Sequence, residues 1–361
     1  MNVVYDNKAY YIQKFGGVSV LFKELHERAL KDSRLQCRFV EYGEGGNSYQ
    51  ESLNIPQELI ISKSPHFFGL KRLFPVQVKD RIPFIFHSTY FSYCGNRNAI
   101  NINTILDFIE ARIGNDIRSR LRAAFQEYII KKSDMNVCIS HSTKRDLLDL
   151  YPSVKEENIR VIHLSASDTY RVIENRKLDL PFPAKSYLIY VGNRAKRKNY
   201  YLLKNIIAQT NYNLVIAGNK LSDEERTELE TYIPASRYVS LGYTDDERLN
   251  ELYNNAAALI YPSSYEGFGI PVLEAQQAGC PVIALDTSSI PEVISVTPTK
   301  CPLLMKEATE KELFSKIQLL SNKELVAQVI ADGLKNTERF SWQKMANEYF
   351  CLYKELLEKK V

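Results

Sequence analysis

Short apolar runs alternate with helical patterns along both halves of this chain, and that alternation constrains the fold more than any other feature. In the first half, the pattern predicts a helix at 18–30 and strands at 3–5, 83–87, 136–140 and 160–163. In the second half, it predicts helices at 200–208 and 223–232 and strands at 187–191, 213–217, 239–241, 257–261 and 281–284. Strands that are separated by helices pair in parallel. The sequence therefore predicts an α/β protein with two doubly wound, Rossmann-like halves.

The length of the chain favours two domains over one. A chain of 361 residues exceeds what a single hydrophobic core usually organises. The polar stretch 170–185 separates the two alternating halves and is the expected linker. We predict one domain at 1–180, a second at 181–342, and a final helix at 343–361.

The composition excludes several classes of protein. Charged residues make up 25% and hydrophobic residues 45%, as in an ordinary globular protein. The six cysteines are scattered, without a Cys-x-x-Cys pair or metal-ligand spacing, so we interpret them as free thiols in a reducing cytosol. No apolar stretch approaches 18 residues, and the N-terminus lacks the pattern of a signal peptide. We therefore expect a cytoplasmic protein.

Basic residues concentrate in the first half. Residues 1–180 hold 26 Lys and Arg against 21 Asp and Glu, and 60–132 holds twelve against five. Two stretches combine this charge with apolar side chains, 66–74 and 112–132, and in the second the apolar residues recur every three or four positions. Such a helix suits either an anionic membrane surface or packing on its own sheet with a solvated basic face. Nucleic acid suits it less, because no recognition motif accompanies the charge.

Two carboxylates, Glu266 and Glu274, flank a glycine-rich turn that follows the predicted strand 257–261. Glu266 lies outside the carboxyl end of that strand, where open α/β sheets bind ligands. Pro271 suits the first turn of a helix and Gly279 suits its end, so a helix is predicted at 271–278. Glu274 then leans back from the first helical turn toward the loop. The spacing predicts a pocket in which both carboxylates meet hydroxyl groups, with an ordinary capping carboxylate as the alternative.

The segment 261–275, together with 278–283 and 289–293, closely resembles the signature of retaining GT-B glycosyltransferases of group 1, or family 4, with bacterial mannosyl- and rhamnosyltransferase-like members. The resemblance implies two Rossmann-like domains that face each other across a cleft, and a C-terminal helix that crosses back to the first domain. It assigns Glu266 to the hydroxyls of the donor sugar and Glu274 to the ribose of the nucleotide. The turn between them would line the donor site with Gly267, Phe268, Gly269 and Ile270.

The loop 192–199 follows the first strand of the second domain and is rich in cations. It resembles the diphosphate clamp of the family, which implies that Arg194 and Lys198 hold the leaving phosphates. Fixed cations at that position stabilise a departing diphosphate without a metal. By charge alone the assignment is ambiguous, because Lys196 and Arg197 lie in the same loop. The resemblance implies four further donor-binding positions, namely Gly192, Gly16, Gly17 and, beside the base, Tyr243.

In the first domain the family pattern is incomplete. Related members typically carry a His-Asp pair after a strand, whereas this chain has Leu106 followed by Asp107. Asp107 stays a candidate catalytic residue. His87, at the end of the predicted strand 83–87, matches a second histidine of mannosyl- and rhamnosyltransferase-like members. We place His87 at the cleft, with a structural core histidine as the alternative.

Together these features predict a metal-independent, retaining glycosyltransferase whose catalytic residues are Arg194, Lys198, Glu266, Asp107 and His87. The expected donor is a nucleotide diphosphate sugar (GDP-mannose, a UDP-sugar or a dTDP-sugar), used as substrate and without a cofactor. The expected acceptor is a glycan or lipid-linked oligosaccharide of O-antigen or capsule biosynthesis, at the inner face of the membrane. The alternative, favoured by the missing histidine, is a catalytically silent homologue that binds a sugar nucleotide or glycan as a subunit. A dehydrogenase is disfavoured because Gly-x-Gly-x-x-Gly is missing near both first strands.

Overall fold

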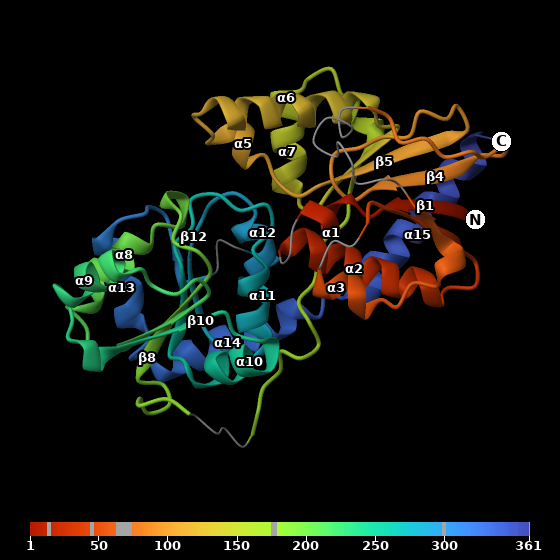
Figure 1. The fold of residues 1–361 in the computed structure, drawn as a ribbon. Helices are drawn as coiled ribbons and strands as arrows, with labels where there is room; N and C mark the ends of the chain where they lie inside the picture. The colour runs from red at the N-terminus through yellow and green to blue at the C-terminus, as the bar shows by residue number, and fades with distance from the viewer. Residues whose placement is uncertain (13–15, 44–46, 63–73, 175–178, 298–300, 361) are drawn as a thin grey trace. The chain divides into compact units, whose positions relative to one another are not determined.

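The computed structural model describes the chain except for residues 13–15, 44–46, 63–73, 175–178, 298–300 and 361. The described residues form two compact units. The first unit combines Met1–Leu164 with Ser341–Val361, and the second is Ser165–Phe340. Each unit contains a parallel β-sheet covered by helices, as the alternating pattern predicts (Figure 1).

Seven parallel strands form the sheet of the first unit, in the order β3-β2-β1-β4-β5-β6-β7. The strands are β1 (Asn2–Asp6), β2 (Gln36–Glu41), β3 (Ile60–Ser62), β4 (Phe84–Ser88), β5 (Ala99–Ile105), β6 (Met135–Cys138) and β7 (Ile159–Val161). β1 pairs with β2 on one side and with β4 on the other, so the strand order reverses between β1 and β4. In open α/β sheets, ligands bind outside the carboxyl ends of the strands at such a reversal.

The helices of the first unit begin at polar capping residues. Asn47, Asp116 and Ser140 each accept a backbone N–H in the first turn of α3, α6 and α7, which satisfies donors that a helix leaves unpaired. The helices are α1 (Lys8–Ile12), α2 (Gly17–Lys31), α3 (Ser48–Ser52), α5 (Ile109–Arg112), α6 (Ile117–Lys132), α7 (His141–Leu150) and α15 (Trp342–Lys360), with short 3-10 helices η1 (Gln57–Leu59) and η2 (Glu156–Asn158).

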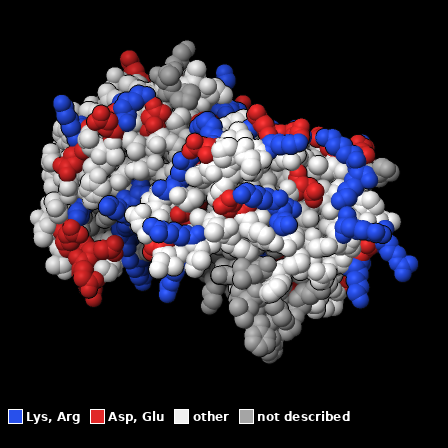
Figure 2. Space-filling view, turned by 90° about the horizontal axis from the view of Figure 1, so that it is seen from above, with Lys and Arg blue, Asp and Glu red and all other residues white. Residues whose placement is uncertain are grey.

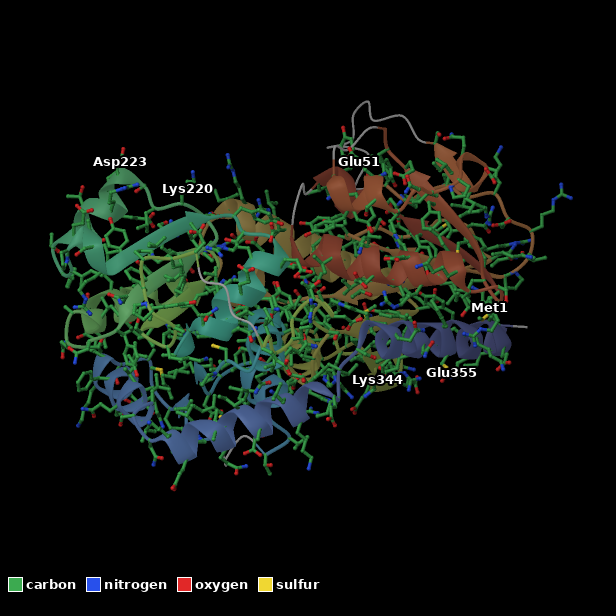
Figure 3. The ribbon with its side chains drawn as sticks, turned by 90° about the horizontal axis from the view of Figure 1, so that it is seen from below. Met1, Glu51, Lys220, Asp223, Lys344 and Glu355 are labelled. Atoms are coloured by element: carbon green, nitrogen blue, oxygen red, sulfur yellow. The ribbon has the colours of Figure 1, made fainter. Side chains whose placement is uncertain are left out.

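The last helix, α15, returns to the first unit and packs on α2 and β4. Its inner face is apolar and aromatic, and it buries Met345, Tyr349 and Tyr353. Lys344 and Glu355 lie on its exposed side (Figure 3). The expected return of the C-terminal helix to the first domain is therefore confirmed.

Six parallel strands form the sheet of the second unit, in the order β10-β9-β8-β11-β12-β13. They are β8 (Tyr187–Val191), β9 (Asn213–Ala217), β10 (Tyr238–Gly242), β11 (Ala258–Tyr261), β12 (Val282–Leu285) and β13 (Leu304–Met305). The helices are α8 (Tyr200–Ile207), α9 (Asp223–Glu230), α10 (Asp246–Asn255), α11 (Ile270–Gln277), α12 (Ile290–Ile294), α13 (Glu310–Leu319) and α14 (Lys323–Thr337), with η3 (Lys196–Lys198) and η4 (Ala235–Arg237). β8 pairs with β9 and β11, so the strand order reverses between β8 and β11.

The two units divide at Leu164–Ser165, which is earlier than the boundary expected from the sequence. The segment after the division binds to α10 of the second unit. The Tyr170 hydroxyl donates to Asp246 (3.0 Å), and the backbone N–H of Arg171 donates to Asn250 (3.1 Å). These hydrogen bonds explain why a polar segment that looks like a linker is part of the second unit.

Candidate active site

Two loops of the second unit leave the carboxyl ends of β8 and β11, the strands between which the order reverses. The β8 loop is 192–199 and contains η3, and the β11 loop is 262–269 and leads into α11. The Ser264 N–H donates to the Arg197 carbonyl, and the Asn199 side chain donates to the Pro262 carbonyl, both at 2.8 Å. These bonds hold the two loops together at the place where α/β sheets bind ligands.

Glu266 lies at the centre of a polar cluster formed by these loops, the Glu266 cluster. Its Oε1 accepts hydrogen bonds from Lys198 Nζ, Ser263 Oγ and Arg197 Nη1, the last at 3.1 Å. Lys198 Nζ also donates to the Tyr261 hydroxyl at 3.0 Å. Only 11% of the Glu266 and Lys198 side chains is exposed, and burial lowers the pKa of the Lys198 ammonium against the opposing effect of Glu266. The structure thus joins two predicted site residues and adds Arg197.

Arg194 contacts another part of the second unit. Its guanidinium forms a bidentate ion pair with Glu225 on α9, at 2.6 and 2.7 Å. It also donates to the carbonyls of Asn219 (2.7 Å) and Lys220 (2.8 Å). All three guanidinium nitrogens are therefore engaged, and Arg194 fastens the β8 loop to the start of α9. The diphosphate contact of Arg194 stays a prediction, and Arg197 is the arginine that lies beside Lys198.

Glu274, the second predicted carboxylate, bonds with residues of a different part of the unit. Its Oε2 accepts a hydrogen bond from the Tyr253 hydroxyl on α10 at 3.1 Å. Burial, with the nearby charge of Asp246, raises the pKa of Glu274 to about 8, and hydrogen bonds from Tyr253 and Tyr170 oppose the rise. The hydrogen bonds of Glu266 and Glu274 thus involve separate groups, and their joint contact with one ligand stays a prediction.

Gly269 sets the entry into α11. Its φ of 100° and ψ of 52° lie in the left-handed region, and a Cβ there would come within 2.7 Å of Ile290 Cδ1. The helix begins at Ile270, one residue before the expected start. Phe268 is buried edge-to-face against Phe340, with ring centroids 5.8 Å apart, and Gly267 is buried beside it. The turn can therefore offer a ligand its backbone more readily than its aromatic ring.

Gly192 opens the β8 loop with a φ of 121°. Among the described residues, a Cβ on Gly192 would meet no atom within 4 Å, whereas a Cβ on Gly218 would meet the Gly192 carbonyl at 2.6 Å. One side of the Gly192 backbone is therefore open.

Tyr243 follows β10, two strands away from β8, and 73% of it is exposed. Its contact with a base stays a prediction.

The glycine pair of the first unit lies at the start of α2. Gly16 precedes the helix, and its carbonyl accepts the Val20 N–H at 3.2 Å. A Cβ on Gly17 would meet no atom of the described residues within 4 Å. The first turn of α2 is thus open to an oxyanion, which helix N-termini favour, and a phosphate contact of Gly16 and Gly17 stays a prediction.

His87 is fully buried in the first unit. Its Nδ1 lies 2.7 Å from the Tyr353 hydroxyl on α15, and its Nε2 lies 2.8 Å from the Thr104 hydroxyl on β5. Burial lowers the pKa of His87 to about 3. The placement of His87 at a cleft was therefore wrong, because both ring nitrogens already have partners inside the core. His87 is a structural core histidine, which was the alternative interpretation of the sequence.

Asp107 and Leu106 follow the carboxyl end of β5 and are half-buried. The Asp107 carboxylate accepts the Ile109 N–H at 3.0 Å at the start of α5, and its carbonyl accepts the Gln126 side chain at 2.9 Å. Asp107 thus shapes the turn into α5. Its catalytic role stays a prediction.

The helix α6 accounts for much of the basic stretch 112–132. Five Lys and Arg and one Glu lie on it, and it buries Ile129 and Ile130 while Ile117 (76%) and Leu121 (66%) are exposed. Figure 2, seen from the side that carries α6 in Figure 1, shows Lys and Arg interspersed with Asp and Glu. Within the described ranges, none of the helices is long and apolar enough to cross a bilayer. Of the other basic stretch, 66–74, only the last residue is among the described residues.

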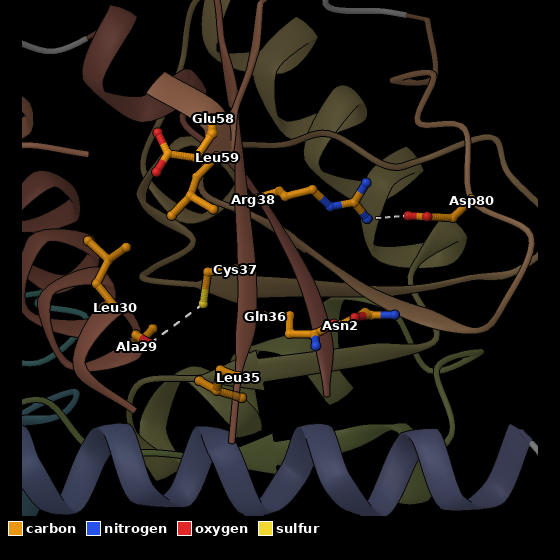
Figure 4. A pocket seen from close by; sticks show the side chains of 10 residues that line it. All are labelled: Asn2, Ala29, Leu30, Leu35, Gln36, Cys37, Arg38, Glu58, Leu59 and Asp80. Carbon is orange, nitrogen blue, oxygen red and sulfur yellow. Dashed lines mark hydrogen bonds and ion pairs between the residues drawn. The ribbon is translucent and has the colours of Figure 1, made fainter. Parts of the chain in front are cut away.

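The six cysteines are all free, as the sequence predicts. Cys37 lines a hollow of about 440 Å³ at the amino ends of β1 and β2, where its Sγ donates to the Ala29 carbonyl at 3.6 Å (Figure 4). Burial raises the pKa of Cys37 to about 12, so it is no reactive thiolate.

Across the residues with described positions, no three His, Cys, Asp or Glu side chains are grouped to hold a metal ion.

Known proteins resemble this chain in sequence and in fold. Residues 173–336 match the family model of glycosyl transferases group 1. O-antigen chain mannosyltransferase B of Escherichia coli is 31% identical over 185 residues, which cover 48% of this chain and 46% of that protein. The chain spans about half the length of the curated relatives it matches.

Solved structures are similar to this chain over the residues of both units. Sucrose-phosphate synthase from Thermosynechococcus elongatus has a TM-score of 0.75 and 17% identity, and the match covers 99% of this chain and 100% of that one. Anabaena HepE in complex with UDP and glucose has a TM-score of 0.71 and 12% identity, with coverages of 98% and 100%. The two α/β units thus define a GT-B fold. Within that class, residues 173–336 are similar to group 1 glycosyl transferases, in agreement with the resemblance of the 261–275 segment, and the roles of Glu266 and Glu274 stay predictions.

Proposed function

We propose that this protein is a retaining glycosyltransferase that moves a sugar from a nucleotide diphosphate sugar to a glycan or lipid-linked oligosaccharide. The observation that carries the proposal is the Glu266 cluster, in which a carboxylate and two cations meet at the strand-order reversal of the group 1 domain. The relative named for O-antigen mannosyl transfer and the neighbour with UDP and glucose support this substrate class. We place the activity in surface polysaccharide assembly.

In this proposal, donor hydroxyls and phosphates replace the internal contacts of the Glu266 cluster. The sugar hydroxyls bind Glu266, and the diphosphate binds Lys198 and Arg197, which neutralise its growing charge. Glu274 binds the ribose. The open side of Gly192 leaves room for the donor beside these cations.

The proposed reaction keeps the configuration of the sugar. The bond between the anomeric carbon and the diphosphate oxygen breaks, and the acceptor oxygen bonds to that carbon from the same face. The acceptor proton passes to the departing diphosphate. Because fixed cations already neutralise the leaving group, we expect transfer to continue in EDTA, and loss of activity that manganese restores would contradict this expectation.

We further propose that the first unit contacts the inner, anionic face of a membrane through α6. Exposed Ile117 and Leu121 lie on a helix that carries an excess of cations, which suits an interfacial helix. Each near-surface cation contributes about 1 kcal/mol to such binding. This placement would bring the enzyme to a lipid-linked acceptor.

Thermal-shift measurements with UDP-, GDP- and dTDP-sugars test the proposed function. A ligand at 100 times its Kd adds about 2.7 kcal/mol of apparent stability, so one donor class should stand out. The responding donor is then incubated with glycan acceptors, and transfer is measured. If the donor binds but is neither transferred nor hydrolysed, the catalytically silent homologue is favoured. Leu106, which replaces the family histidine, is the argument for that alternative. A chain that no nucleotide sugar stabilises would refute the donor assignment.

A further inference from the structure

A pocket of about 470 Å³ lies within the first unit, at the strand-order reversal of its own sheet. Lys8 and Ile12 line it from α1, which follows β1, and Tyr90 and Phe91 line it from the segment after β4. Arg118 and Arg122 of α6 close another side. Because β1 and β4 are the strands between which the order reverses, this pocket occupies the ligand position of an open α/β sheet.

The inner wall of the pocket contains an ammonium group that is held in an ion pair. The Lys8 side chain is 3% exposed, and its Nζ lies 3.8 Å from Oδ2 of the fully buried Asp6. The Ser92 hydroxyl donates to the same carboxylate oxygen, and the Lys8 N–H donates to Oδ1 at 3.2 Å. The ammonium is therefore held in place before any ligand arrives.

Two arginines on α6 add positive charge on the outer side. Arg118 and Arg122 are four residues apart, so they lie on one face of the helix. Arg122 Nη1 binds Glu110 at 2.6 Å. The Arg118 guanidinium has no hydrogen bond or ion pair with any other residue that the structure describes. Arg118 is thus the cation best able to bind a new anion.

The remaining wall is apolar and aromatic. Leu121 and Phe125 of α6 line the pocket, and Leu121 is 66% exposed. Phe91 has a φ of 37°, a left-handed conformation that is costly for an aromatic residue and that clusters at functional sites. Its ring lies 4.7 Å from the ring of Tyr90. An apolar chain would find partners here that an inorganic ion would not.

We propose that this pocket binds the phosphate-bearing end of a lipid-linked acceptor, with the phosphate oxygens at Arg118 and Arg122 and the first part of the lipid chain along Leu121 and Phe125. The proposal rests on the proposed function, whose acceptor it narrows from any glycan to an amphiphile with a phosphate group. Cations beside aliphatic and aromatic side chains match both parts of such a molecule.

Calorimetric titration of the full chain with farnesyl diphosphate tests the pocket directly, because this soluble probe joins a diphosphate to a prenyl chain. We expect Arg118→Ala to weaken binding about tenfold or more, as the loss of a charged hydrogen bond would. Arg120→Ala is the matched control, because Arg120 is also exposed on α6 but does not line the pocket. Its affinity should stay within about twofold of wild type. Equal affinities of the two variants would overturn the proposal.

Further titrations distinguish binding of the diphosphate from binding of the prenyl chain. Inorganic pyrophosphate and farnesol should each bind at least about tenfold more weakly than farnesyl diphosphate, because each lacks half of the contacts. If inorganic pyrophosphate or farnesol bound as tightly as farnesyl diphosphate, the assignment of an amphiphilic ligand would be overturned. Lys198→Ala should leave farnesyl diphosphate binding unchanged, and competition by UDP would assign the probe to the second unit instead. These titrations need no nucleotide sugar, so failure of the proposed donor and failure of this pocket are told apart.

Discussion

Arg194, Arg197 and Lys198 carry like charges within five residues, but the structure gives them different partners. Lys198 and Arg197 donate to Glu266, whereas Arg194 is bound to Glu225. We predict that Lys198→Ala and Arg197→Ala each lower kcat by about 10²–10³-fold, because each removes a fixed cation from the leaving group. Steady-state kinetics with the responding donor would measure this loss.

Arg194→Ala is expected to act mainly on stability. Removing a guanidinium that satisfies two carbonyls and Glu225 should cost about 1–3 kcal/mol in the free energy of unfolding, with a smaller loss of kcat. Thermal denaturation next to the kinetics separates the two effects. An Arg194→Ala protein with a wild-type melting temperature and a lost turnover would support the diphosphate contact of Arg194.

Glu274 should make the second unit sensitive to pH. Its folded-state pKa of about 8 lies above the ordinary value of 4.5, so the folded state holds a proton that the unfolded state releases. This contribution to stability is complete below about pH 4.5 and is lost as the pH rises through about 8. Glu274→Gln should therefore be the more stable protein above pH 8, by a few kcal/mol at about 1.4 kcal/mol per pKa unit.

Urea unfolding of wild type and Glu274→Gln at pH 6 and pH 9 measures this difference. The same titration with the nucleoside diphosphate reports whether ribose binding needs the carboxylate. Equal pH dependence of the two proteins would show that Glu274 is ionised throughout this range.

Elements of the second unit were predicted more fully than those of the first, and particular residues explain why. The strands β8 and β9 are apolar apart from Asn213 at the start of β9, and they lie where the sequence predicts them. β5 was missed because Asn101 and Asn103 interrupt its pattern, yet both are buried. Asn101 accepts the Cys94 N–H at 2.6 Å, a partner that no local pattern reveals. The partners of His87 are also non-local, 17 residues away on β5 and 266 residues away on α15.

The residues of the candidate site were also predicted only in part. The segment 261–275 revealed Glu266 without any structure, because its spacing repeats a family signature. The choice between Arg194 and Arg197 depends on which partner each guanidinium reaches, and Glu225 on α9 is 31 residues from Arg194. The pocket of the first unit gave no sequence signal beyond basic and apolar residues on α6, because its other walls come from α1 and the segment after β4.

The helix α6 yields a prediction about membranes. Leu121→Glu replaces an exposed apolar side chain with a charge, so it should weaken binding to vesicles that contain anionic lipid by about tenfold while leaving the fold intact. Co-sedimentation with anionic and neutral vesicles would measure this. The matched change Tyr201→Glu alters a 47%-exposed residue of the second unit and should have no effect. If the wild-type protein bound neutral vesicles as strongly as anionic vesicles, this would contradict an electrostatic contribution to binding.

At the scale of the whole molecule, each unit has its own sheet and core, so we expect calorimetry to resolve more than one unfolding transition. A nucleoside diphosphate that binds the Glu266 cluster should raise only the transition of the second unit, by about 2.7 kcal/mol at 100 times its Kd. Scans with and without the nucleotide test this. An equal shift of both transitions would contradict a donor site confined to the second unit.

The position of α15 also orders events on the ribosome. Tyr353, which satisfies Nδ1 of the buried His87, leaves the exit tunnel only after all of Ser165–Phe340 has been synthesised. The sequence of the second unit is therefore complete in the nascent chain before α15 is added to the first unit. A chain truncated before Trp342 would therefore contain all of the second unit, but it would leave uncovered the surface of α2 and β4 on which α15 packs.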